Sequence, residues 1–225
     1  MLLLIFAPQP PAAQAEYINL ASALGDVYSA LNAAGPSDLV FWTETELYQY
    51  FDEAAERLAR TVGCFVERDT SLTTAVNTGT YGLPTDQVAV VQADMGGQVL
   101  RPRNVHELEA LDYSWPMTVG PPVAFVKDTA GMTSGSEQMT IYPACDEAHE
   151  GLTIGLVLHV LPATISSSNA LLGAPTAIRE YFTFRALEAA RGKQSKAEMP
   201  DVANWFGQLA GYMEQVMSDL WGSAT

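Results

Sequence analysis

One ten-residue run limits the possible folds more than any other part of the chain. From Leu152 to Leu161 every even position is apolar, and these positions hold Leu152, Ile154, Leu156, Leu158 and Val160. Because successive side chains of a strand point to opposite faces, the run predicts a β-strand with one face on a core. His159 then lies on the outer face, where we expect it to be solvated or paired.

Similar short segments, separated by glycine and proline turns, extend the β-rich pattern over about residues 65–165. Val88–Met95 and 98–101 flank Gly96 and Gly97, two glycines that can supply the positive φ angles of a type I′ hairpin turn. This spacing of short strands predicts a small antiparallel β-sandwich or barrel.

Two further elements are expected inside this β-rich region. Residues 123–127 should pair with residues 138–142 across the loop between them. A short helix over 104–111 should interrupt the strands, because Asn104 can serve as its N-cap and Glu107 then occupies the third helical position.

Helical patterns precede the β-rich region. Thr43 to Glu46 form a capping box, and apolar residues follow at helical spacing as far as Val62, so the sequence predicts a helix over 44–62 that exits at Gly63. A weaker pattern over 17–33 predicts another helix, which should end before Gly35 and Pro36.

Helical patterns also follow the β-rich region. Pro175 suits the first turn of a helix over 176–191, which Gly192 can close. Asp201 is then expected to cap a final helix over 201–221. Its apolar residues recur every 3.5 positions and predict one narrow packing seam of Val202, Phe206, Leu209, Met213, Val216 and Leu220.

The predicted fold class is therefore α+β, a helical bundle built from both chain ends with an inserted antiparallel β-sandwich or barrel. We expect residues 16–64 and 170–225 to form the bundle and residues 65–169 to form the insertion. Residues 1–15 should be an extended arm, because their apolar run of six residues is shorter than the about 7–15 of a signal peptide and follows no basic residue.

Charge limits the possible partners. The chain holds 26 acidic and 11 basic residues, a net charge of −15, and no Lys or Arg precedes Arg57. Tight nucleic-acid binding needs clustered basic side chains, so the sequence argues against it. An acidic surface would let DNA pass without sticking, although solubility alone is the simpler explanation of the charge.

No pattern of catalytic or metal-binding residues is found. His106, His149 and His159 lack any metal-binding spacing, and the acidic segment 146–150 is better explained as a turn than as a cation site. Cys64 and Cys145 are far apart, and two buried reduced thiols are favoured over a disulfide. We therefore predict a protein that is not an enzyme and that holds no metal and no cofactor.

Candidate partner-binding residues lie at the end of the last helix. Trp221 follows the final position of the predicted seam, and Met217 and Leu220 are its apolar neighbours. Tryptophan is enriched at protein interfaces, so Trp221 is a candidate anchor, with burial in the core as the alternative.

The order of these features resembles a known family. The step Trp42-Thr43-Glu44-Thr45-Glu46-Leu47 opens a helix carrying Tyr50 and Phe51, and similar pieces follow at 81–86, 108–115, 120–122 and 177–181. This pattern resembles the head-to-tail adaptor (connector) proteins of tailed bacteriophages, in the subgroup with a β-rich insertion. The arm 1–15 is not part of the pattern.

The resemblance implies a structural virion protein without a membrane-bound or enzymatic role. It implies a homo-oligomeric ring, commonly of twelve copies, that docks on the portal protein, meets tail proteins and extends the channel for genome ejection. It would be assembled in the host cytoplasm and reside in the neck of the virion. We expect acidic side chains of the helical part to line this channel. The alternative is a secreted or periplasmic β-sandwich binding module, suggested by the signal-like start, and a hydrolase with an unrecognised carboxylate site is a third possibility.

Overall fold

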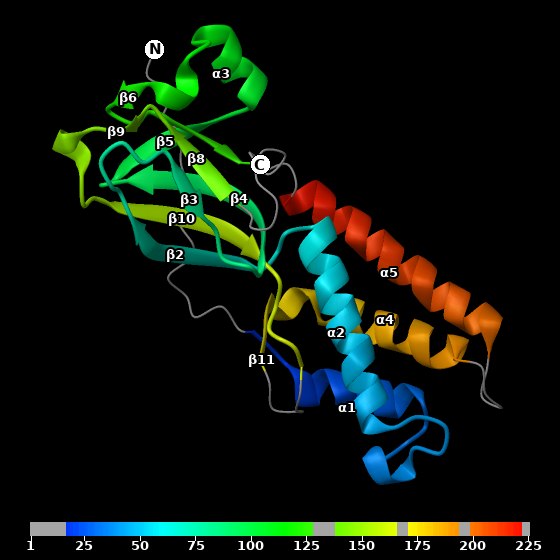
Figure 1. Ribbon diagram of the computed structural model, residues 1–225. Helices are drawn as coiled ribbons and strands as arrows, with labels where there is room; N and C mark the ends of the chain where they lie inside the picture. The colour runs from blue at the N-terminus through cyan, green and yellow to red at the C-terminus, as the bar shows by residue number, and fades with distance from the viewer. Residues whose placement is uncertain (1–16, 128–137, 166–170, 194–198, 222–225) are drawn as a thin grey trace, which may run out of the picture. The chain divides into compact units, whose positions relative to one another are not determined.

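A computed structural model describes residues 17–127, 138–165, 171–193 and 199–221 of the 225-residue chain. It combines five α-helices with a seven-stranded sheet and two two-stranded pairs among these residues (Figure 1). The chain divides into two compact units: a helical unit of Met1–Ala55 with Ala163–Val216, and a β unit of Glu56–Pro162 with Met217–Thr225. The predicted domain boundaries stay a prediction, since a compact unit need not fold by itself. The predicted arm 1–15 lies outside the described residues.

The first helix is shorter than the sequence predicted. A strand, β1 (Tyr17–Asn19), precedes α1 (Leu20–Ala30), so the expectation of a helix over 17–33 was wrong at both ends. Asn19 explains the late start, because its side chain accepts a hydrogen bond from the backbone N–H of Ala21 and caps the helix. β1 pairs antiparallel with β11 (Leu171–Pro175).

The second helix, α2 (Glu44–Thr61), confirms the prediction to within one residue. The backbone N–H of Thr43 donates to Oε2 of Glu46 at 2.8 Å, and the N–H of Glu46 donates to Oγ1 of Thr43 at 3.2 Å, so both halves of the capping box are present. Gly63 follows the helix with a φ of +67°, a backbone conformation that glycine adopts without strain.

The last two helices also lie close to their predicted positions. A 3₁₀ turn (Thr176–Ile178) leads into α4 (Arg179–Gly192), and α5 spans Pro200–Trp221. Asp201 was wrongly assigned as an N-cap, because α5 begins one residue earlier, at Pro200, and Asp201 lies in its first turn. A proline is favoured there, since its missing N–H would have no partner in the helix.

Aromatic side chains fill the core of the helical unit. The rings of Phe51 and Phe182 stack with their centroids 6.4 Å apart, and Tyr181 meets Phe182 edge to face at 5.4 Å. The indole N–H of Trp42 donates to the backbone oxygen of Ala190 at 2.8 Å, which ties the start of α2 to the end of α4. Burial of Trp42 is therefore accompanied by a partner for its one polar atom.

The predicted seam of α5 is buried only in part: Phe206 stacks on Phe184 of α4 with ring centroids 6.0 Å apart, and Leu209 and Met213 are half-buried. The buried residues of α5 are Ala203, Ala210 and Met217, whereas Val202 is 37% and Leu220 is 68% exposed. Longer side chains bridge α4 and α5, as in the ion pair of Arg185 with Glu214. The hydrophobic period thus identified an apolar stripe that is half-buried in its middle and exposed at Val202, Val216 and Leu220.

The β unit holds the seven-stranded sheet, in the order β2-β10-β4-β5-β7-β8-β3. The bounds of these strands are Val66–Thr73 (β2), Thr80–Gly82 (β3), Gln87–Met95 (β4), Gln98–Arg103 (β5), Ala124–Lys127 (β7), Gln138–Tyr142 (β8) and Thr153–Val160 (β10). The predicted hairpin is confirmed, because β4 pairs with β5 across Gly96 and Gly97, which both have positive φ. The pairing of β7 with β8 is confirmed too, and the loop between them lies outside the described residues.

The sequence predicted a wholly antiparallel arrangement, and this was wrong, because the sheet is mixed. β5 and β7 run parallel, as do the short strands β6 (Val119–Gly120) and β9 (Ala144–Cys145). Parallel neighbours need a crossover connection, and the helix α3 (Val105–Leu111) lies in the connection from β5 to β7. The described strands of the β unit are joined into one seven-stranded sheet with a small pair beside it, and residues from both halves of the sheet share one core.

Both faces of this sheet carry apolar side chains. The main core lies on one face and contains Ile154, Leu156 and Leu158 of β10, as the alternating run predicted. On the other face a second cluster of Leu108, Trp115 and Val126 packs beneath α3 and the following 3₁₀ turn (Trp115–Met117). The helix α3 therefore acts as a cover for the outer face, and its predicted capping box of Asn104 and Glu107 is present.

Candidate functional site

The predicted partner-binding residues differ in accessibility. Leu220 is 68% exposed, Met217 is 4% exposed, and the side chain of Trp221 lies outside the described part of the chain. Their role in binding a partner stays a prediction. Of the two residues with described side chains, Leu220 is exposed enough to contact a partner and Met217 is not.

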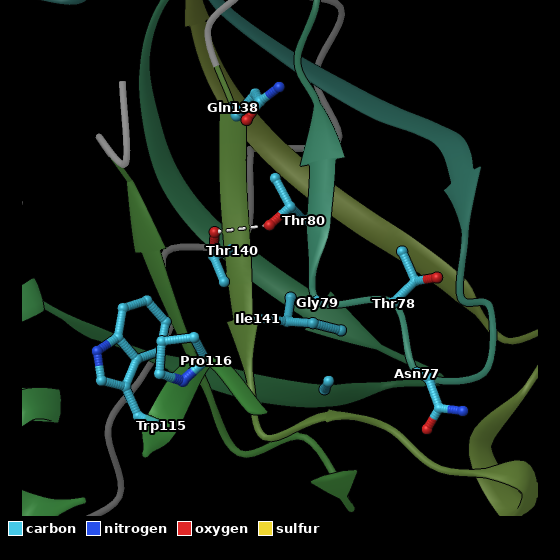
Figure 2. Close-up of a pocket in the computed structure, with 10 residues that line it drawn as sticks. Asn77, Thr78, Gly79, Thr80, Trp115, Pro116, Gln138, Thr140 and Ile141 are labelled. Atoms are coloured by element: carbon cyan, nitrogen blue, oxygen red, sulfur yellow. Dashed lines mark hydrogen bonds between the residues drawn. The ribbon is translucent and has the colours of Figure 1, made fainter. Parts of the chain in front are cut away.

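A cavity of about 440 Å³ opens between β3, β8 and the 3₁₀ turn that follows α3 (Figure 2). Trp115 and Pro116 form one wall, and Thr80 and Thr140 lie opposite, with their hydroxyl oxygens 3.3 Å apart. The cavity thus combines an aromatic ring with hydroxyl and amide groups, a set that suits a polar or peptide ligand.

The lining of this cavity limits its chemistry. Its ten lining residues, Asn77, Thr78, Gly79, Thr80, Trp115, Pro116, Gln138, Thr140, Ile141 and Ala144, hold no acid, base or thiol. A hydroxyl needs an adjacent base to act as a nucleophile, so these residues can bind but lack the means of acid–base catalysis.

Asp112 fixes the cover formed by α3 and the 3₁₀ turn. Its Oδ2 accepts hydrogen bonds from the Thr118 hydroxyl at 2.5 Å and from the Tyr142 hydroxyl at 3.3 Å, and its Oδ1 accepts from the N–H of Ser114. The hydrogen bond from Thr118 is the largest cause that lowers the pKa of Asp112. Burial, followed by the charge of Asp112, raises the pKa of Tyr142.

A second hollow, of about 410 Å³, lies between α3 and the outer face of β5 and β7. We call it the arginine groove, after Arg101 and Arg103, which project into it together with Val99 from alternate positions of β5. Its apolar wall includes Leu111 and Val123, which are 69% and 46% exposed. The groove therefore offers cationic and apolar groups side by side.

Arg101 has a distinctive position among the basic residues. Arg103 lies 3.4 Å from Glu107 and Arg68 lies 3.0 Å from Asp94. The other arginines and lysines with described side chains, apart from Arg101, have interactions of their own. Among the arginines and lysines whose side chains the structure describes, Arg101 is the one whose side chain makes neither an ion pair nor a hydrogen bond with another described residue. An unpaired guanidinium at a groove with apolar walls is suited to a carboxylate from a partner.

The acidic segment 146–150 and the two cysteines, the other groups considered from the sequence, have structural surroundings. The acidic segment contains a 3₁₀ turn (Glu147–His149), in which a ring nitrogen of His149 lies 2.5 Å from Asp146, in agreement with the predicted turn. Across the described ranges, no group of three or more His, Cys, Asp or Glu side chains could hold a metal ion. Cys64 and Cys145 are both free, and burial raises the pKa of the Cys64 thiol to about 12.

Sequence reasoning missed the arginine groove. Its signal was the alternation of Val99, Arg101 and Arg103 in a strand whose intervening Leu100 is buried, which places all three on one outward face. The position of α3 over that face depends on the parallel crossover from β5 to β7, which no local sequence pattern indicated. No described helix has the length and apolar character required to cross a bilayer.

Comparison with known proteins extends over nearly all of the chain. The profile of a family described as SU10 adaptor protein matches residues 13–224, which include every residue that the structure describes. A search of curated proteins found no match. A match over so much of the sequence covers the helical unit and the β unit alike.

Proposed function

Since this chain belongs to the SU10 adaptor protein family, a family of structural phage proteins, we propose that it is the head-to-tail adaptor between portal and tail. The match over residues 13–224 is the observation that carries the proposal. In this role several copies form a ring, commonly of twelve, that docks on the portal protein and prolongs the DNA channel toward the tail proteins. The ring resides in the neck of the virion after assembly in the host cytoplasm.

The charge of the chain supports a role as a conduit. A net charge of −15 per copy gives a ring with a strongly negative potential, which repels the phosphate backbone and keeps the genome from adhering during ejection. We assign the lining of the channel to acidic side chains of the helical unit, whose first segment, residues 1–55, contains seven carboxylates and no lysine or arginine.

Two of the described cavities support a non-enzymatic role, while a third, at the start of α4, is lined by Glu180 and by Asp26, which pairs with Arg179. The cavity beside Trp115 is lined by no ionisable side chain, and the arginine groove is lined by arginines and a tyrosine but by no carboxylate, histidine or thiol. Hydrolysis commonly needs a base or a metal-bound water, and these linings supply neither. Both hollows are instead suited to contacts with protein segments.

We assign two kinds of contact to two parts of the chain. The end of α5, with exposed Leu220 beside Met217 and Trp221, is proposed to anchor the ring on a partner protein. The β unit, which we propose to equate with the β-rich insertion of the adaptor subgroup, is proposed to contact neighbouring copies and tail proteins.

Assembly with a portal ring tests this function directly. The full chain is mixed with the purified portal protein of the same phage, and the complex is examined by mass photometry and electron cryomicroscopy. The expected result is a closed ring of adaptor copies on the portal ring, with a central channel and acidic side chains toward its lumen. A chain that stays monomeric beside the portal ring, or a lumen dominated by lysine and arginine, would contradict the proposal.

A further inference from the structure

A ring built from this chain has to overcome electrostatic repulsion between its copies. Each copy carries a net charge of −15, so interfaces that bring acidic surfaces together are disfavoured. Because the chain has 11 basic residues against 26 acidic ones, a basic group without a partner in its own copy is the natural place for an acidic group of the next copy. Arg101 is such a group within the described chain.

The surroundings of Arg101 define what it can bind. It lies on β5 between Val99 and Arg103, and all three face the arginine groove beneath α3. Val99 and Leu111 are 57% and 69% exposed, so the groove presents apolar surface as well as positive charge. A segment that carries one carboxylate followed by apolar side chains would satisfy both features.

Such a segment occurs in the helical unit. Residues 38–41, Asp38-Leu39-Val40-Phe41, connect a 3₁₀ turn (Pro36–Asp38) to the start of α2. Val40 is 80% exposed and Phe41 is 38% exposed, and Asp38 is also exposed. Leu39 has extended backbone angles, and Oδ2 of Asp38 accepts a hydrogen bond from the N–H of Ala34, which holds the loop in shape.

We propose that the arginine groove of one copy receives residues 38–41 of the neighbouring copy, with Asp38 paired to Arg101 and Val40 against Val99 and Leu111. The inference rests on the proposed ring and names the surfaces that join its copies. Because the two surfaces differ and lie on different parts of the chain, the contact is heterologous, the kind from which a ring is built when its rotation closes. It also places a scarce cation of each copy against an anion of the next.

A charge exchange tests the pairing. Arg101→Glu and Asp38→Arg are made singly and together in the full chain, and ring formation on the portal ring is followed by mass photometry over a range of chain concentrations. Each single variant should raise the concentration for half-maximal assembly about tenfold, because it brings like charges together. The double variant should return it to within about threefold of the unaltered chain.

The matched control is Arg60→Glu, which changes the net charge by the same amount at a 57% exposed arginine of α2 paired with Glu56. It should assemble like the unaltered chain. Assembly of Arg101→Glu at unchanged concentration would overturn the inference while leaving the ring intact, and so would a double variant without recovery. Loss of portal binding by Arg101→Glu copies that still form rings would assign the groove to the portal and overturn the inference. Failure of the unaltered chain to form a ring would overturn the proposed function as well.

A second measurement does not depend on the charge variants. Two chains are prepared separately, one with Val40→Cys and one with Val99→Cys, and are mixed with the portal ring under mild oxidation. A disulfide that joins these two cysteines can form only between copies, because each chain carries one of them. A dimer band on a non-reducing gel, absent when either chain is used alone, is expected. Absence of that band in assembled rings would overturn the inference.

Discussion

Arg185 of α4 and Glu214 of α5 form an ion pair in which Nη2 lies 2.6 Å from Oε1, with side chains only 11% and 13% exposed. The Tyr181 hydroxyl donates to the same carboxylate oxygen at 2.7 Å, and Arg185 also donates to Glu188 at 2.7 Å. Burial, followed by the hydrogen bond to Glu214, raises the pKa of Tyr181 above its ordinary value. This network joins the last two helices at a fixed register.

Removal of the carboxylate from this network should destabilise the helical unit. Glu214→Gln leaves the Arg185 guanidinium with Glu188 alone in a setting that water scarcely reaches, and we expect a loss of about 3 kcal/mol in the free energy of unfolding. Urea unfolding followed by circular dichroism measures it. Glu56→Gln, which breaks an exposed pair with Arg60, is the control and should cost less than about 0.5 kcal/mol. Equal losses in the two variants would contradict the buried network.

Two glycines of α5 should respond differently to the same substitution. A Cβ at Gly207 would lie 2.4 Å from Oε1 of Glu188, whereas a Cβ at Gly211 would meet no atom within 4 Å. Gly211→Ala should stabilise the chain by about 0.5–1 kcal/mol, because alanine favours the helix. Gly207→Ala should gain nothing or destabilise, because Glu188 must move away from Arg185. Urea unfolding measures the free energy of unfolding of both variants. Equal stabilisation would show that Glu188 moves without cost.

The Asp112 cover should make the β unit sensitive to acid. Since the pKa of Asp112 is lowered from its ordinary value of 3.8 in the folded chain, the stabilising contribution is complete above pH 3.8 and is lost as the pH falls through the lower, folded value. The difference in Tm between the unaltered chain and Asp112→Asn should therefore be largest at neutral pH and shrink below pH 3.8. Glu67→Gln, at an exposed position of β2, controls for the loss of one charge. A difference that stays constant with pH would contradict this account.

The thiols should react slowly while the chain is folded. Burial raises the pKa of Cys64 to about 12 and also raises the pKa of Cys145, and the thiolate is the reactive form. At pH 8, about one Cys64 thiol in ten thousand is then ionised. We expect reaction with an aromatic disulfide reagent to be at least about 100-fold slower than for free cysteine. Denatured chain, in which both thiols should react at once, is the control, and rapid reaction of the folded chain would contradict the burial.

Local signals predicted the local parts of the fold. The capping boxes at Thr43 and Asn104 and the glycine pair at Gly96 and Gly97 each depend on neighbouring residues, and each is present. The pairing of β1 with β11 and the parallel pairing of β5 with β7 join distant segments, and no local pattern indicated them. The fold class was therefore predicted in outline, while the arrangement of the strands was not.

The candidate site shows the same division. Exposed Leu220 belongs to an apolar stripe that the sequence identified, but periodicity cannot tell whether a chain covers such a stripe itself or leaves it for a partner. Arg101 could be placed on an outward strand face from alternation alone. Its lack of a partner depends on where α3 and the acidic residues lie in space, and only the folded chain reveals it.

The place of β10 in the sheet has a consequence for synthesis on the ribosome. β10 is the last strand of the sheet to be made, yet it lies between β2 and β4, to which it is bonded on both sides. A nascent chain that ends before Thr153 would hold two strands whose shared neighbour does not yet exist, and their unpaired edges would be open to other chains. Emergence of β10 from the ribosome as far as Val160 therefore marks the first point at which these two strand edges can be covered.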